Sequence, residues 1–134
     1  MKSRKSLIIF CDAKENILIQ DRRTIKKPSK PYGFFGGSIE EGETPEQALK
    51  REIQEELTLT LTRFKLMKKI VLKNPEVEME WHIFLAPIPD LGKVVVEEGQ
   101  LFLTTIEEAL KLDISERDVQ LLRDLRHWLK NQTI

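Results

Sequence analysis

Hydrophobic residues first recur in two short runs near the N-terminus. Residues 7–11 and 16–20 are mostly apolar and contain several isoleucines, and four residues, three of them charged, separate them. Two such runs around a short polar segment predict a β-hairpin. Residues 21–31 lose this pattern and predict a loop that contains Pro28 and Pro31. We expect most of its basic side chains to be solvated and a minority to reach a bound phosphate; they are Arg22, Arg23, Lys26, Lys27 and Lys30.

Strict alternation marks a third strand. The apolar positions Val77, Met79, Trp81, Ile83 and Leu85 alternate with Glu76, Glu78, Glu80, His82 and Phe84. This period predicts a strand with one face on a core. Asn74 and Pro75 predict a turn before it, so residues 63–72 are expected to form its antiparallel neighbour. Residues 94–96 and 101–103 predict two further short strands.

Capping residues predict three helices. Thr44 precedes Pro45 and has Gln47 three positions later, the pattern of an N-cap with a capping box. Weaker starts pair Thr105 with Glu108 and Ser115 with Asp118, and an apolar stripe marks the last helix at Val119, Leu122, Leu125 and Leu129. We therefore expect a single domain over residues 1–134, of the α/β (α+β) class, with a mixed sheet flanked by helices.

Composition narrows the range of partners. The chain has 22 Lys plus Arg and 22 Asp plus Glu, so its formal net charge is zero and no polymeric nucleic acid is expected as a partner. Cys11 is the only cysteine, which excludes an intrachain disulfide and a multi-cysteine zinc site. Residues 7–11 are too short for a signal-peptide core, and no apolar stretch is long enough for a membrane span. We expect a cytoplasmic protein without membrane contact.

The densest chemistry lies on the helix predicted after Thr44. At about 100° per residue, Glu52, Glu55 and Glu56 fall within one arc of roughly 100°, beside an apolar line of residues that faces the core. Like charges at this spacing repel one another unless a cation lies between them. A cluster of oxygen ligands suits Mg²⁺ or Mn²⁺.

A solvated, highly charged helix is the structural alternative. In that interpretation Arg51 pairs with Glu55 at i, i+4 and no ligand is involved. Gly36 and Gly37 favour a binding site, because a glycine pair just upstream lets main-chain groups approach a ligand closely.

These residues resemble the signature of the Nudix hydrolase family. That signature is glycine, five residues, glutamate, seven residues, Arg-Glu, a bulky aliphatic, any residue, Glu-Glu, any residue, glycine and a bulky aliphatic. The chain departs from it only at Thr58, which stands where the family has glycine. The matching positions are Gly37, Glu43, Arg51, Glu52, Ile53, Glu55, Glu56 and Leu59.

The resemblance implies an α/β/α sandwich and hydrolysis of the pyrophosphate link in a nucleoside diphosphate joined to a group X. The expected substrate is a nucleoside triphosphate or an oxidised or modified nucleotide, cleaved to a monophosphate and pyrophosphate. Residues 112–118 lack the proline-rich segment common in members that act on oxidised purines, which argues against that preference. ADP-ribose or another nucleotide sugar is the alternative, since Pro75 stands 16 residues after Leu59. A nucleotide-binding sensor with weak turnover is a further alternative.

The resemblance also implies roles for individual residues. It assigns metal binding to the Gly36 carbonyl, Glu52, Glu55, Glu56 and Glu98, with Mg²⁺ as the cofactor and Mn²⁺ as a substitute; Glu98 lies in a Glu-Gly-Gln segment similar to that of triphosphate-cleaving members. Glu52 or Glu55, and next Glu98, is expected to accept the proton of the attacking water.

Two other signature positions carry supporting roles. Arg51 is expected to orient Glu55, and Glu43 to fix the loop and the helix start.

Threonine in a left-handed position costs roughly 1 kcal/mol, so Thr58 predicts altered local geometry with activity retained. The small-molecule substrate is the expected partner, and the protein is expected to be a monomer or homodimer.

Overall fold

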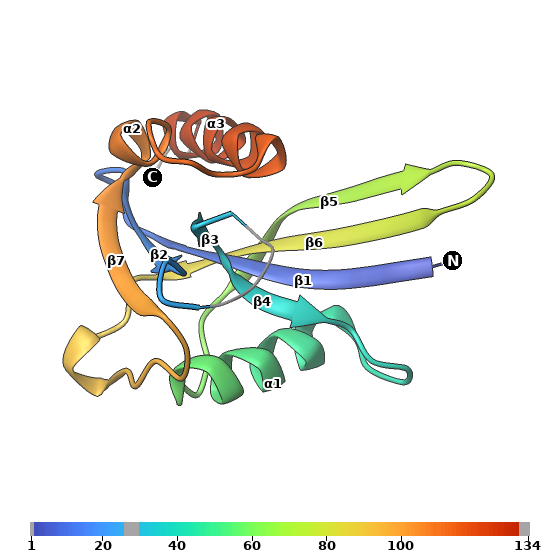
Figure 1. Cartoon of the computed structure of the whole chain (residues 1–134), viewed down its shortest axis with the longest axis horizontal. Coiled ribbons are helices and arrows are strands. Elements are labelled where there is room, and N and C mark those ends of the chain that lie inside the picture. Colours follow the sequence, from blue (N-terminus) through green and yellow to red (C-terminus); the bar gives the residue numbers. More distant parts are fainter. Residues whose placement is uncertain (1, 26–29, 132–134) are drawn as a thin grey trace.

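One mixed β-sheet organises the computed structural model, which describes residues 2–25 and 30–131 (Figure 1). The predicted loop residues Lys26, Lys27 and Pro28 lie outside the described residues. The strands are β1 (Lys2–Cys11), β2 (Asn16–Asp21), β3 (Tyr32–Gly33), β4 (Phe35–Ser38), β5 (Lys65–Lys73), β6 (Glu78–Pro87) and β7 (Gln100–Thr105). The helices are α1 (Pro45–Leu57), α2 (Ile106–Ala109) and α3 (Glu116–Lys130), with a 3₁₀ turn at Leu91–Lys93.

The strands of the described residues follow the order β3-β2-β1-β6-β5, with β4 also paired to β1 and β7 to β2. The predicted hairpin is confirmed, because β1 and β2 pair antiparallel with Phe10 opposite Leu18. The predicted pairing of residues 63–72 with the alternating strand is confirmed as β5 and β6. β1 and β6 run parallel, with Leu7 opposite Ile83, which makes the sheet mixed.

Helices cover both faces of the sheet, with α1 on one side and α2 and α3 on the other (Figure 1). Ile83 and Leu85 pack toward α2 and α3, as the alternation predicts. Phe84 points the other way and is also buried, because α1 covers that side. The C-terminal half of β6 therefore separates two cores instead of facing one.

The predicted helix starts are confirmed. The Thr44 hydroxyl accepts a hydrogen bond from the Gln47 amide, and the Gln47 side chain accepts one from the Thr44 amide. These two bonds satisfy backbone donors that a helix start leaves unpaired. Ser115 caps α3 and Thr105 caps the short α2, each through one bond, in which the hydroxyl accepts from the backbone amide three residues later. Among the described residues, no helix has the length and apolar character needed to span a lipid bilayer.

The strand predicted at residues 94–96 is wrong. The Val95 amide donates to the Leu57 carbonyl at 3.1 Å, and the Glu97 amide donates to the Glu56 carbonyl at 2.8 Å. The last carbonyls of a helix have no partner within the helix. The segment thus pairs with the end of α1 instead of a strand, and this contact brings residues 97 and 98 to the carboxylates of α1.

Candidate active site

A cleft of about 530 Å³ lies between the end of α1, the segment before β7 and the start of the loop after β2. It brings together the five residues for which metal binding is predicted. Three further side chains with polar groups line it, although the motif does not include them. The lining residues are Gln20, Arg22, Ile25, Gly36, Glu52, Glu55, Glu56, Glu97 and Glu98.

The two glycines let β4 lie directly against the carboxylates of α1. The Gly36 amide donates a hydrogen bond to Glu56 Oε1 at 3.1 Å. Gly36 has φ +141°, and a Cβ there would collide with the Ser6 carbonyl oxygen, whereas a Cβ on Gly37 would collide with the carboxylate of Glu52. The main chain at the glycine pair therefore lies close to the carboxylates of α1, while its approach to a ligand stays a prediction.

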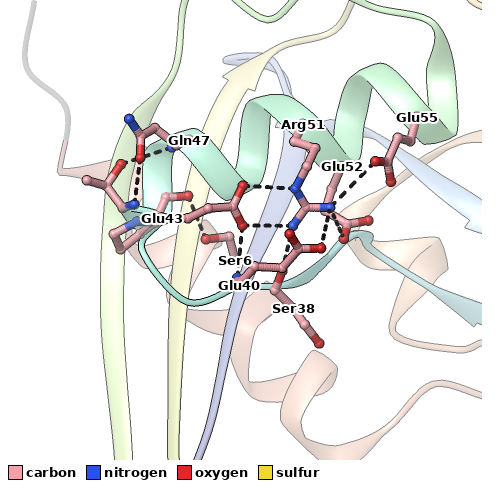
Figure 2. A network of polar contacts seen from close by, with 10 residues as sticks. Ser6, Ser38, Glu40, Glu43, Gln47, Arg51, Glu52 and Glu55 are labelled. Carbon is pink, nitrogen blue, oxygen red and sulfur yellow. Dashed lines mark hydrogen bonds and ion pairs between the residues drawn. The ribbon is translucent and has the colours of Figure 1, made fainter.

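Arg51 joins the turn before α1 to the carboxylate face (Figure 2). Its guanidinium donates to both oxygens of Glu43 at 2.9 Å and to Glu52 Oε1 at 3.0 Å. The predicted contact with Glu55 is present but longer, at 3.6 Å. Glu43 is thus the main partner of Arg51, and it also accepts a hydrogen bond from the Glu40 amide at 2.8 Å.

These contacts shift the pKa values of Glu43 and Arg51. The hydrogen bonds from Arg51 lower the pKa of Glu43 to about 2, and the amide of Glu40 acts in the same direction. The bond to Glu43 raises the pKa of Arg51 above its usual range. Both groups therefore stay charged throughout the neutral range, so the ion pair persists at working pH.

The cleft carries a strong excess of negative charge. Five glutamates line it, while Arg22 is the basic residue of the lining. In the described part of the chain, no three carboxylate, imidazole or thiol side chains lie close enough to form a ready metal cluster. Mutual repulsion keeps such carboxylates apart unless a cation lies between them. The donor set consists of oxygen atoms, which fits a hard divalent cation.

Gln20 and Arg22 form a small hydrogen-bonded cluster that contacts the segment containing Glu98. The Gln20 amide donates to the Glu98 carbonyl at 3.0 Å, and Gln20 accepts from Arg22 Nε at 2.7 Å. Arg22 also donates to the Phe34 carbonyl at 2.8 Å, and its burial lowers the pKa of the guanidinium. The motif does not identify Gln20 or Glu97. Contacts between residues 78 positions apart have no local signal in the sequence.

Thr58 ends α1 in the left-handed conformation, with φ 51° and ψ 41°. Its amide donates to the Gln54 carbonyl at 3.0 Å. Threonine therefore occupies the strained geometry that glycine adopts freely. The chain therefore accommodates the departure from the signature by strain in a left-handed turn and not by another path of the backbone.

Comparison with known proteins agrees with this geometry. The family model described as the NUDIX domain matches residues 1–125. An 8-oxo-dGTP diphosphatase of Proteus vulgaris is 34% identical over 77 residues, which cover 58% of this chain and 69% of the relative. An 8-oxo-dGTP diphosphatase of Escherichia coli strain K12 is 51% identical over 68 residues, 51% of this chain and 53% of the relative. The chain thus aligns with only about half of the second relative.

Among solved structures, the E. coli ORF135 protein superposes with a TM-score of 0.74 at 25% identity, over 94% of this chain and 89% of that one. The chain belongs to the Nudix family. This confirms the predicted Nudix hydrolase and the predicted mixed sheet with helices. Nudix hydrolases generally use divalent metal ions. The named relatives support the predicted nucleotide pyrophosphohydrolase activity.

Proposed function

We propose that this protein is a Mg²⁺-dependent pyrophosphohydrolase that cleaves a nucleoside triphosphate to a monophosphate and pyrophosphate. The observation that carries the proposal is the convergence of Glu52, Glu55, Glu56 and Glu98 on one cleft. Three of them come from α1, and Glu98 comes from a segment more than 40 positions away. A solvated helix would need none of this arrangement.

The carboxylates of the cleft are suited to a divalent ion, with Mg²⁺ first and Mn²⁺ as a substitute. Glu52, Glu55, Glu56 and Glu98 would hold it, with the Gly36 carbonyl as an additional oxygen ligand. When bound, a divalent ion neutralises the phosphate charge and lowers the pKa of water. Without a bound cation, these carboxylates would repel the negatively charged triphosphate.

Proton transfer is assigned to the carboxylates of α1. Glu52 and Glu55 both lie at the cleft, and either can accept the proton of the attacking water, with Glu98 as the next candidate. The side chain of Glu52 is 18% exposed and is held by Arg51, whereas that of Glu55 is 61% exposed. We favour Glu55 as the proton acceptor, because Arg51 occupies an oxygen of Glu52 through a shorter contact.

The substrate class follows from the relatives and from charge. Two relatives are named 8-oxo-dGTP diphosphatase, which favours an oxidised purine nucleoside triphosphate despite the missing proline-rich segment. Arg22 is the basic residue of the cleft lining, and in this proposal it contacts a phosphate oxygen of the substrate. ADP-ribose remains the alternative substrate, and a sensor with weak turnover the alternative function. The cytoplasm and a monomeric or homodimeric state stay predictions from the sequence.

Product analysis tests this proposal. Purified protein is incubated with 8-oxo-dGTP and Mg²⁺, and the products are separated by anion exchange. We expect 8-oxo-dGMP and pyrophosphate in equal amounts. Glu55→Gln should lose turnover, whereas Glu46→Gln, at an exposed position in the first turn of the same helix, should keep it. Formation of 8-oxo-dGDP and orthophosphate would contradict the assigned bond, and full activity of Glu55→Gln would contradict the assigned site.

A further inference from the structure

Gln20 is a buried polar residue on a strand that is otherwise apolar at its centre. It is 6% exposed, and the period of β2 places it on the same face as Leu18, toward α1. A further aliphatic side chain at this position would extend the core. An amide there needs partners for its donor and its acceptor, because burial removes both from water.

Both partners are present, and they fix the amide in one orientation. Gln20 Oε1 accepts from Arg22 Nε at 2.7 Å, and Gln20 Nε2 donates to the Glu98 carbonyl at 3.0 Å. A guanidinium only donates, so the oxygen of the amide must face Arg22. The nitrogen is thereby directed at the main chain of Glu98.

Two other contacts fix the same segment on either side of Glu98. The Glu97 amide donates to the Glu56 carbonyl at 2.8 Å. Gly99 has φ +72°, and a Cβ there would collide with the Asp21 carbonyl oxygen. The segment is therefore held against α1 before Glu98 and against β2 after it, while Gln20 holds Glu98 itself.

We propose that Gln20 is a positioning residue that fixes the main chain of Glu98 and so keeps its carboxylate at the cleft beside those of α1. This inference rests on the proposed function, in which Glu98 helps to hold a divalent ion. Gln20 acts through Glu98, since its amide oxygen is bonded to Arg22 and its amide nitrogen to the Glu98 carbonyl.

Metal binding without nucleotide tests the inference separately from turnover. Mn²⁺ affinity is measured by electron paramagnetic resonance for wild type, Gln20→Met, Glu98→Gln and the double variant. Gln20→Met keeps the side-chain length and removes both hydrogen bonds. We expect it to weaken Mn²⁺ binding on the order of 10-fold, as loss of a partner that orients a ligand does. The double variant should bind no more weakly than Glu98→Gln alone, because the two residues act in series.

Two further variants complete the design. Gln120→Met is the matched control, because Gln120 lies on α3 and bonds Asp124 at 3.0 Å; its Mn²⁺ affinity should equal that of wild type. Gln20→Leu also removes both hydrogen bonds and adds no charge to the cleft lining. It should reproduce the loss, and it decides the question if Gln20→Met does not fold.

Each outcome has one meaning. Weaker binding by Glu98→Gln with unchanged binding by both Gln20 variants would overturn the positioning role alone. Additive losses in the double variant would overturn action through Glu98. Unchanged binding by Glu98→Gln, or no Mn²⁺ binding by wild type, would overturn the metal role of Glu98 and this inference with it.

Discussion

The guanidinium of Arg51 donates hydrogen bonds to both carboxylate oxygens of Glu43, eight residues earlier, at 2.9 Å each. This fork ties the turn before α1 to the middle of the helix, and its remaining nitrogen reaches Glu52 at 3.0 Å. A bidentate pair fixes direction as well as distance. The position of the Glu52 carboxylate in the cleft therefore depends, through Arg51, on the position of the turn before α1.

Replacing Arg51 by lysine should reduce turnover without unfolding the protein. Lysine keeps the charge but cannot present two parallel donors to Glu43. We expect kcat to fall by about 10-fold, in the range found when a partner of a metal ligand is lost. The measurement is steady-state hydrolysis together with circular dichroism. Arg123→Lys on the exposed side of α3 is the control, and equal rates for the two variants would contradict the role of the fork.

Acid should weaken the fold through Glu43. Its pKa is lowered in the folded state from the usual 4.5 to about 2, chiefly by the hydrogen bonds from Arg51. A lowered pKa means that the contribution of this contact to stability is complete above pH 4.5 and disappears as the pH falls toward 2. We expect the free energy of unfolding of Glu43→Gln to depend less on pH within that window than that of wild type. Parallel curves for the two proteins would show that the fork does not stabilise the fold.

Thr58→Gly should stabilise the protein. Threonine at φ 51° carries a left-handed strain of about 1 to 2 kcal/mol, part of which is offset by the greater freedom of glycine in the unfolded chain. We expect a net gain in the free energy of unfolding on the order of 1 kcal/mol by urea denaturation. Thr58→Ala keeps a Cβ in the strained conformation and should gain less. A loss of stability in Thr58→Gly would mean that the threonine side chain makes a compensating contact.

Divalent metal should raise the melting temperature. An ion bound only by the folded protein stabilises it by about 2.7 kcal/mol at 100 times its dissociation constant. We expect Mg²⁺ to shift Tm of wild type and to have little effect on a Glu52→Gln, Glu56→Gln double variant. A scan of Tm against Mg²⁺ concentration measures both, with Ca²⁺-free buffer and equal ionic strength. Equal shifts in the two proteins would place the binding outside the cleft.

Local patterns predicted most of the fold because hairpins, caps and alternation depend on neighbours in sequence. The hairpin of β1 and β2 and the capping box of Thr44 are examples. The failure at residues 94–96 has a tertiary cause, since valines that look like a strand instead satisfy the carbonyls at the end of α1. Periodicity carries no information about such a partner.

The residues of the candidate site likewise fall into two groups, those that the sequence identifies and those that only the tertiary structure reveals. The spacing of Glu52, Glu55 and Glu56 on one helix identifies them in the sequence, because helical geometry alone places them together. Gln20 and Glu97 reach the cleft only through contacts between distant segments. The preference of Arg51 for Glu43 over Glu55 likewise depends on the path of the turn before α1, which spacing does not define.

The most direct test of the proposed hydrolase measures pyrophosphate release from 8-oxo-dGTP and dGTP, and AMP release from ADP-ribose, by wild type and Glu56→Gln, with and without Mg²⁺. We expect Mg²⁺-dependent release of pyrophosphate from a nucleoside triphosphate, fastest from 8-oxo-dGTP. We also expect turnover to fall by about 100-fold or more in Glu56→Gln, because losing a metal ligand costs at least as much as losing the residue that orients it. Turnover by wild type that persists without divalent metal, or that is unchanged in Glu56→Gln, would contradict a hydrolase centred on the carboxylates of α1.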